Sequence, residues 1–379
     1  MVAKVKKPTV LIIENSIDTT GAFNSIFNYA RYAQAEYHFL FVLPHKSQLL
    51  KRVRQSGFEV ETLPFREISK NSVNLLLYFP TLLINAIRLK KIAQERQASI
   101  VHVNDFYNLV GVMTKAIGGK FTLLTHVRFM PNRFPPLLVK FWMKLNLVYS
   151  TYIICVSKAV KQCLSDHSKL RVIYDSLASF PSEFVFREHA EDGRIKLLYL
   201  AHYIPGKGQD IALEAFVNAY QQNPKLRFRF VGGDMGLEKN KQYKEYLEQR
   251  AKALEIYPVI EFNGATSNVA EELKQTDIFL NFSESESFSM TCLEALASGV
   301  PLVATDSGGP AELFEHGMSG YLVPNRDAEA GTKAILLLAE DKRIRKRFSQ
   351  NGISYVRCKF STENTVGKLT NLYAKIVTC

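Results

Sequence analysis

Short apolar runs alternate with amphipathic stretches along almost the whole chain. The runs are rich in Val, Ile, Leu and Phe, which is typical of strands buried on both faces of a parallel sheet. Between them, apolar residues recur every three or four positions, which predicts helices. Strands are predicted at 8–14, 37–43, 58–62, 99–104, 120–126, 152–156, 171–174, 195–201, 227–231, 259–262 and 321–324, and two more lie within 277–313. Helices are predicted at 46–56, 73–97, 108–117, 211–220, 241–253, 269–274, 328–340, 342–351 and 362–376.

The alternation of strand and helix occurs in two series, separated by the polar stretch 178–194. A chain of 379 residues is also long enough for two cores. We therefore predict an α/β fold of two Rossmann-like, doubly wound domains facing a cleft. The predicted parts are a first domain at 1–180, a linker at 181–194, a second domain at 195–360 and a last helix, with no strand after it, within 361–379.

The net charge of +12 belongs to the first half of the chain. Residues 1–190 hold 25 Lys and Arg against 12 Asp and Glu, a net +13, whereas residues 191–379 hold 23 against 24, a net −1. Such a basic half is either a solvated face or a surface attracted to lipid headgroups or an anionic acceptor. The stretch 127–150 mixes Arg and Lys with Phe, Met and Trp, which fits a membrane interface or a loop and helix that pack on the sheet.

Five scattered cysteines, without a CxxC pair or a His-Cys cluster, indicate reduced thiols in a cytoplasmic protein. The N-terminus has no apolar segment before a small-residue cleavage site, so we expect no signal peptide. No apolar run reaches the roughly 20 residues that a membrane span needs. No spacing of His, Asp or Glu predicts a metal site.

Two glutamates, Glu286 and Glu294, are separated by seven residues. We predict that Glu286 lies on the loop after a strand and that Glu294 lies just inside the next helix, with Ser289 as its N-cap. A loop carboxylate beside a helix N-terminus suits a ligand that carries hydroxyls and phosphates. The alternative is that both are ordinary surface carboxylates. The small-residue loop Ser307–Pro310 is expected to leave room for a ligand.

Lys207 stands between two glycines, after a predicted strand and before a predicted helix. The glycines would let a phosphate approach the backbone, and the lysine would supply a point charge, although the spacing is not that of a P-loop. The alternative is a solvated lysine in an ordinary turn. In the first half, His102 and His126 end strands and Gly21 lies in the loop before a helix, where ligands of such sheets bind. Strand-end histidines are also common structural residues.

The two glutamates, with the run ALASGVPLVATDSGGPAEL that follows, resemble the signature of glycosyltransferase family 4, which comprises retaining enzymes of the two-domain GT-B fold. The resemblance spans nearly the whole chain and is densest over 195–324. It implies a last helix that crosses back to the first domain. The chain departs from the family by having Ala201-His202 where Gly-Arg is common, and Ser287 and Ser289 where glycine is common. A histidine at 202 would carry a charge only part of the time near pH 7.

The resemblance also implies roles for individual residues. Glu286 would contact the donor sugar, Glu294 the ribose hydroxyls and Lys207 the diphosphate. His126 would face the sugar from the first domain, so Glu286, Lys207 and His126 are the predicted catalytic residues. The predicted substrate-binding residues are Gly21 near the diphosphate and acceptor, His202, Gly264 beside the nucleobase, Ser287, Phe288, Ser289, Met290, Thr291 and Glu294.

The implied reaction is transfer of a hexosyl unit from a nucleotide diphosphate sugar to an acceptor hydroxyl, with retention and without a metal or cofactor. The expected partners are that donor and a sugar, lipid-linked or polysaccharide acceptor of cell-envelope or exopolysaccharide assembly, with no nucleic acid. The basic first half adds a peripheral association with an anionic membrane on its cytoplasmic face. Two alternatives remain: a nucleotide-sugar epimerase on the same fold, and a non-catalytic nucleotide-sugar-binding module.

Overall fold

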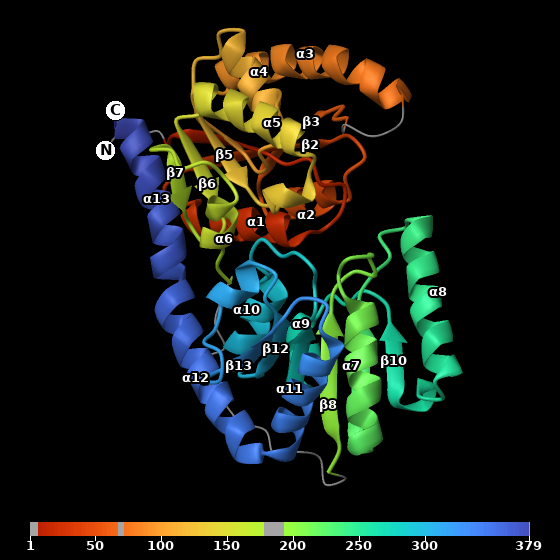
Figure 1. Ribbon diagram of the computed structural model, residues 1–379. Coiled ribbons are helices and arrows are strands. Elements are labelled where there is room, and N and C mark those ends of the chain that lie inside the picture. The colour runs from red at the N-terminus through yellow and green to blue at the C-terminus, as the bar shows by residue number, and fades with distance from the viewer. Residues whose placement is uncertain (1–6, 67–71, 178–192, 379) are drawn as a thin grey trace. The chain divides into compact units, whose positions relative to one another are not determined.

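The computed structural model describes residues 7–66, 72–177 and 193–378 (Figure 1). The chain divides into two compact units, one formed by Met1–Ala178 with Thr362–Cys379 and the other by Ser179–Ser361. The linker predicted at 181–194 lies almost wholly outside the described residues.

The first unit is built on a seven-stranded parallel sheet in the order β3-β2-β1-β4-β5-β6-β7. Its central strands are continuous apolar runs because helices cover both faces of the sheet. The strands are β1 Thr9–Ile13, β2 His38–Pro44, β3 Glu59–Leu63, β4 Ala98–Val103, β5 Thr122–Val127, β6 Tyr152–Cys155 and β7 Leu170–Val172.

Helices cover both faces of this sheet. One side carries α3 Ser72–Glu95, α4 Val110–Ala116 and α5 Pro136–Tyr149 (Figure 1). The other side carries α1 Gly21–Ala33, α2 Leu49–Gln55 and α13 Thr362–Thr378, which share a core with β1 and β2. The 3-10 helix η1 Pro131–Arg133 and α6 Lys158–Gln162 complete the described elements of this unit. The predicted return of the last helix to the first domain is confirmed, because α13 belongs to this core.

The second unit repeats the scheme with a six-stranded parallel sheet in the order β10-β9-β8-β11-β12-β13. Its strands are β8 Ile195–Leu200, β9 Leu226–Val231, β10 Ile260–Asn263, β11 Ile278–Asn281, β12 Leu302–Thr305 and β13 Gly320–Val323. Its helices are α7 Gln209–Gln222, α8 Glu238–Ala253, α9 Val269–Lys274, α10 Met290–Ala297, α11 Ala328–Glu340 and α12 Lys342–Phe360, with 3-10 helices η2 Tyr257–Val259 and η3 Gly309–Glu312.

The strand order reverses in both sheets at the first strand of the unit. β1 pairs with β2 and β4, and β8 pairs with β9 and β11. This is the order of a doubly wound Rossmann-like sheet, so the predicted fold class is confirmed. Ligands of such sheets bind outside the carboxyl ends of the strands where the order reverses.

Candidate functional site

The candidate site lies at the reversal point of the second sheet, where β8 and β11 are neighbours. The loop after β8, residues 201–208, carries Lys207 and is called the lysine loop below. The loop after β11, residues 282–289, carries Glu286 and is called the acidic loop. Both loops leave the same edge of the sheet because the two strands are parallel.

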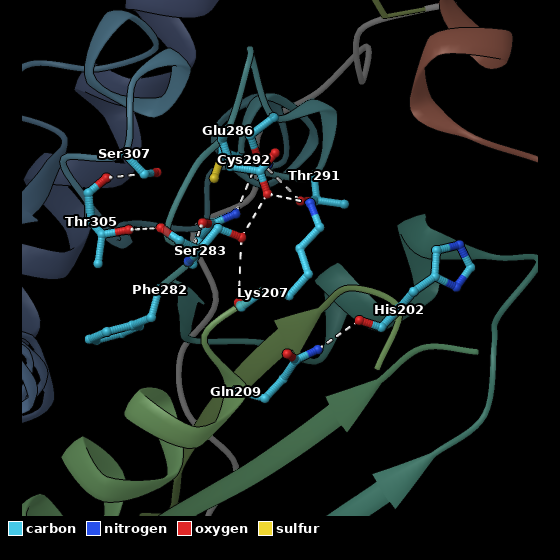
Figure 2. A network of polar contacts seen from close by, with 12 residues as sticks. His202, Lys207, Gln209, Phe282, Ser283, Glu286, Thr291, Cys292, Thr305 and Ser307 are labelled. Carbon is cyan, nitrogen blue, oxygen red and sulfur yellow. Dashed lines mark hydrogen bonds and ion pairs between the residues drawn. The ribbon is translucent and has the colours of Figure 1, made fainter. Parts of the chain in front are cut away.

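Lys207 and Glu286 form an ion pair that joins the two loops (Figure 2). Lys207 Nζ lies 2.6 Å from Oε1 of Glu286, and Ser283 Oγ donates to the same oxygen at 2.7 Å. The Lys207 side chain is 33% exposed, so an incoming anion has access to the ammonium group. Two side chains that the sequence predicted to serve one ligand are therefore in direct contact.

Tyr199, a buried residue of β8, holds the two loops together. Its hydroxyl donates to the carbonyl of Lys207 and accepts from the N–H of Phe282 at 2.8 Å. Burial raises the pKa of this hydroxyl, so it stays protonated. A tyrosine inside an apolar strand gives no sequence signal of this role, so the sequence alone does not predict it.

Gly208 brings the two loops into backbone contact. Its φ of +73° lies in the left-handed region, and a Cβ at this position would lie 1.9 Å from the carbonyl oxygen of Phe282. Only glycine fits there. The second glycine of the lysine loop thus packs one loop on the other, and Lys207 is held next to Glu286.

The loop Ser307–Gly309 supports the acidic loop through backbone contacts. Glu286 N donates to the carbonyl of Ser307 at 3.0 Å, and Gly309 N donates to the carbonyl of Glu286 at 2.8 Å. A Cβ at Gly309 would lie 2.3 Å from the Cα of Phe288. At Gly309 the small residue thus allows two backbones to pack, and whether the rest of the loop Ser307–Pro310 leaves room for a ligand stays a prediction.

The acidic loop ends in an unusual helix start. Ser289 is the N-cap of α10, as predicted, and its φ of +78° lies in the left-handed region that favours glycine. The Ser289 hydroxyl accepts from Cys292 N at 3.4 Å and from Asn281 Nδ2 at 3.2 Å, which compensates for the strain. Met290 and Thr291 open the helix, so their N–H groups lie at the positive end of its dipole.

Phe288 anchors the acidic loop from within. Its side chain is 2% exposed, and its ring centroid lies 5.6 Å from that of Phe360 at the end of α12. Because the ring points into the core, the loop around it is fixed. The neighbouring Ser287 is half-buried.

Glu294 lies in the second turn of α10, as the sequence predicted. Burial raises the pKa of its carboxyl to about 7. Desolvation is the single cause, so no charge or hydrogen bond from the described residues offsets it. A carboxyl in such a setting is ready to accept hydrogen bonds from ligand hydroxyls, which would restore its ionised form.

His202 points away from the ion pair (Figure 2). Its Nδ1 lies 3.2 Å from the carbonyl oxygen of Gly233, and because a carbonyl only accepts, Nδ1 donates. Its own carbonyl accepts from Gln209 Nε2 at 2.8 Å. The imidazole therefore lies toward the loop after β9, and not beside Lys207. Gly264 lies exposed in the loop after β10, with nothing close to where a Cβ would stand.

His126 is buried in the first unit, 2% exposed, and its ring stacks on His102 with centroids 5.3 Å apart. Arg128 Nη2 lies 3.3 Å from its Nδ1, and an arginine can only donate. His126 Nδ1 is therefore the acceptor and Nε2 carries the proton. Burial, reinforced by the Arg128 charge, lowers the pKa of His126 well below its usual range, so the ring is neutral.

The same logic fixes His102. Its Nδ1 lies 2.6 Å from the hydroxyl of Tyr373 on α13, and its Nε2 lies 3.2 Å from His126 Nδ1. Tyr373 donates to His102, and His102 donates to His126. Burial lowers the pKa of His102 to about 3, so it too is neutral. At the end of this relay, His126 Nε2 is a buried donor with no partner in the described part of the chain.

Gly21, the remaining predicted site residue of the first unit, is exposed. It is the first residue of α1 and directly follows the N-cap Thr20. Whether Gly21 and His126 approach the donor stays a prediction. Within residues 7–66, 72–177 and 193–378, no three metal-binding side chains form a cluster. No helix among those residues is long and apolar enough to cross a bilayer.

Two family models match the chain. The model described as glycosyl transferases group 1 matches residues 182–355, and the model described as glycosyltransferase family 4 matches residues 19–176. Together the two models match most of the chain and identify it as a glycosyltransferase. The chain belongs to glycosyltransferase family 4, as the resemblance in the sequence predicted.

Similar proteins act in glycoconjugate and polysaccharide synthesis. The N-acetyl-alpha-D-glucosaminyl L-malate synthase of Bacillus anthracis is 33% identical over 34% of this chain and 34% of its own length. A D-inositol 3-phosphate glycosyltransferase of Geodermatophilus obscurus is 33% identical over 48% of this chain and 41% of its own length. This chain thus matches less than half of the length of either relative.

Solved structures share the fold over almost the full chain. The HepE protein of Anabaena, crystallised with UDP and glucose, superposes with a TM-score of 0.80 at 19% identity, over 96% of this chain and 99% of that chain. The sucrose-phosphate synthase of Thermosynechococcus elongatus gives 0.80 at 17% identity, over 98% and 100%. Both support the two-domain GT-B fold.

Proposed function

We propose that this glycosyltransferase moves a hexosyl unit from a nucleotide diphosphate sugar to an acceptor hydroxyl and retains the anomeric configuration. The observation that carries the proposal is the Lys207–Glu286 pair next to the N-terminus of α10. A cation, a carboxylate and helix N–H groups at one edge are what a ligand with phosphates and hydroxyls needs. HepE, which has the same fold, binds UDP and glucose.

Each part of the donor would be bound by the site residues whose chemistry suits it. Lys207 and the N–H groups of Met290 and Thr291 would take the diphosphate. Glu286 and the N–H groups of Phe288 and Ser289 would take sugar hydroxyls. Glu294 would accept from the ribose hydroxyls. The loop around Gly264 would lie by the nucleobase.

In the proposed step, the acceptor oxygen forms a bond to the anomeric carbon on the face from which the diphosphate departs. The bond from that carbon to the diphosphate oxygen breaks, and its electron pair leaves with the phosphate, whose oxygen takes the acceptor proton. Lys207 and the α10 N-terminus stabilise the growing negative charge. One such preorganised donor contributes roughly 3–4 kcal/mol. The chemistry needs no metal or cofactor, since protein cations and dipoles carry the charge.

His202 is a weaker candidate for this charge than its position in the sequence implied, because its ring points away from Lys207. His126 suits hydrogen-bond donation to the sugar better than proton transfer. It is neutral, and its free group is the Nε2 proton. A buried donor of this kind binds a hydroxyl without titrating near neutral pH.

The acceptor would be a sugar, lipid-linked or polysaccharide substrate of cell-envelope or exopolysaccharide assembly. The net charge of +13 in residues 1–190 supports a cytoplasmic enzyme that associates peripherally with an anionic membrane. Two similar proteins fit this assignment by name: a Vi polysaccharide biosynthesis protein of Salmonella typhi and a lipopolysaccharide core biosynthesis mannosyltransferase of Rhizobium leguminosarum.

The test measures donor binding and transfer in variants of the ion pair. A thermal-shift screen of nucleotide diphosphate sugars identifies the donor, because a ligand that binds only the folded state raises the melting temperature. Lys207→Ala and Glu286→Gln should then lower turnover at least about 100-fold. Lys333→Ala and Glu329→Gln, which remove an exposed ion pair on α11, are the matched controls and should leave turnover unchanged.

Near-wild-type turnover in both ion-pair variants would contradict the proposal. Incubation with the donor alone separates it from an epimerase, because an epimerase changes the donor sugar without an acceptor. Addition of a chelator tests the metal-independent chemistry, and a loss of activity restored by a divalent cation would overturn that part.

A further inference from the structure

Helix α3 exposes an apolar stripe on the side that faces away from the sheet. Its other side is buried against the unit, as expected for a helix in this layer. Positions 76, 79, 83 and 87 recur at intervals of three or four, and positions 77 and 84, seven residues apart, lie next to them on the same side of the helix. The exposed residues are Leu76, Leu77, Phe79, Leu83, Ile84 and Ile87, with exposed fractions from 37% to 77%.

Helix α5 repeats the pattern in the same helical layer (Figure 1). Trp142 and Met143 are buried on its inner side, so the packing interpretation of the stretch 127–150 holds for that side. On the outer side Leu137 is 81%, Phe141 45% and Val148 62% exposed. These three positions are four and seven residues apart, again one face of a helix.

Basic residues complete both stripes. On α3, Arg88 and Lys91 are exposed and follow the apolar residues in sequence. On α5, Lys140 and Lys144 are exposed and lie between Leu137 and Val148 in sequence. Lys91 also pairs with Glu95 at 3.7 Å. Residues 68–94 contain four Lys or Arg and residues 106–150 contain six, and neither range contains an Asp or Glu.

We infer that the exposed faces of α3 and α5 dock the enzyme onto an anionic lipid bilayer. An apolar face flanked by Lys and Arg is the pattern of helices that lie in the membrane interface. The basic side chains would meet lipid phosphates while the Leu, Ile and Phe side chains enter the acyl boundary. Neither helix is long and apolar enough to span the bilayer, which fits a helix that lies on it.

This inference rests on the proposed peripheral membrane association, for which it names the surface. It is independent of the transfer chemistry, since none of the proposed site residues lies on α3 or α5. Donor binding measured in parallel therefore distinguishes failure of the docking surface from failure of the proposed reaction.

The experiment is co-sedimentation of the full chain with vesicles of phosphatidylcholine alone and of an equal mixture of phosphatidylcholine and phosphatidylglycerol. The wild type should bind the anionic vesicles and not the neutral ones. The triple variant Leu83→Gln/Ile84→Gln/Ile87→Gln should lower binding at least about tenfold. Lys140→Gln/Lys144→Gln should also weaken binding, and added salt should reduce the effect of this charge change.

The matched control is Leu237→Gln/Leu254→Gln/Leu337→Gln in the second unit. These residues are 44%, 44% and 48% exposed, against 45%, 48% and 56% for the α3 triple. The control should bind vesicles like the wild type, and all variants should keep wild-type donor binding. Equal loss in the control and α3 triple variants would overturn the inference. The inference would also be overturned if the wild type did not bind anionic vesicles. The same holds if the wild type formed a dimer that the α3 substitutions dissociate.

Discussion

Ser289 shows how a residue can replace glycine at a strained position. Members of the family commonly have glycine there, and the φ of +78° explains why. A side chain in the left-handed region costs roughly 1–2 kcal/mol. The serine hydroxyl compensates by capping α10 and accepting from the buried Asn281. The departure from the family signature is therefore compatible with an ordered helix start.

Glu294 leads to a prediction about pH. Its carboxyl is raised to a pKa of about 7 by burial, and it would bind ribose hydroxyls as a carboxylate. Donor affinity should therefore rise with pH, with binding about tenfold weaker at pH 6 than at pH 8, since a protonated fraction must first ionise. Calorimetry with a nucleotide diphosphate sugar measures this, because its diphosphate does not titrate in that range.

The Glu294→Gln variant is the control, and its weaker affinity should no longer change with pH. A wild-type affinity that is flat between pH 6 and pH 8 would contradict the assignment of Glu294.

The same carboxyl also affects the stability of the fold. Folding raises the pKa of this carboxyl from 4.5 to about 7. Its contribution to the stability of the fold is therefore fully present below pH 4.5 and is lost as pH rises to about 7.

At the scale of elements, apolar runs and glycine-bearing loops predicted the strands and the two doubly wound series. Local pattern did not predict where helices pass close to one another. Helix α12 was expected to end at 351 but continues to Phe360, because Val356 and Phe360 are buried. Gly352, a usual stop signal, instead allows close packing: a Cβ there would lie 2.9 Å from Leu296 of α10.

The sequence likewise predicted those site residues that local patterns mark, and not those that depend on long-range contacts. Lys207, Glu286 and Glu294 stand in loops and a helix start that sequence patterns mark. Tyr199 and the burial of His126 depend on contacts between distant segments, which one sequence does not show. At Gly309 a backbone occupies the space that the missing side chain leaves, and residue size alone does not tell whether a ligand or a backbone fills such a space.

Strand β8 acts on the site through Tyr199, which yields a second prediction. Tyr199→Phe keeps the ring but removes the hydroxyl that joins the carbonyl of Lys207 to the N–H of Phe282. The variant leaves the N–H of Phe282 unpaired and the carbonyl of Lys207 with only the 3.4 Å bond from Ser283 Oγ, which should cost about 1–3 kcal/mol of unfolding free energy. Because the hydroxyl positions both loops and touches no substrate, donor KM should rise more than kcat falls.

Denaturant unfolding and steady-state kinetics check this prediction. Thr332→Val is a useful control, because it removes another buried hydroxyl of this unit, which donates to the carbonyl of Ala328 at 2.8 Å and lies on α11, in neither loop. It should lower stability with a smaller effect on KM. Equal effects of the two variants on KM would mean that Tyr199 has no special role in positioning the loops.

At the scale of the whole molecule, each unit has its own sheet and its own core. The proposed diphosphate and ribose contacts all lie in the second unit, whereas His126 and Gly21 belong to the first. Hydrogen exchange should therefore separate two stages. A nucleoside diphosphate should protect the lysine loop, the acidic loop and the start of α10, without protecting residues of the first unit.

An intact nucleotide diphosphate sugar should add protection around His126 and at the start of α1, because the sugar would supply an acceptor that His126 Nε2 does not find among the described residues. His126→Ala should abolish this additional protection and keep the protection in the second unit. Tyr373→Phe, which removes the donor to His102, should weaken it by loosening the ring of His126. Identical exchange with the diphosphate and with the sugar donor would contradict the proposed contact between His126 and the donor sugar, and would restrict the donor site to the second unit.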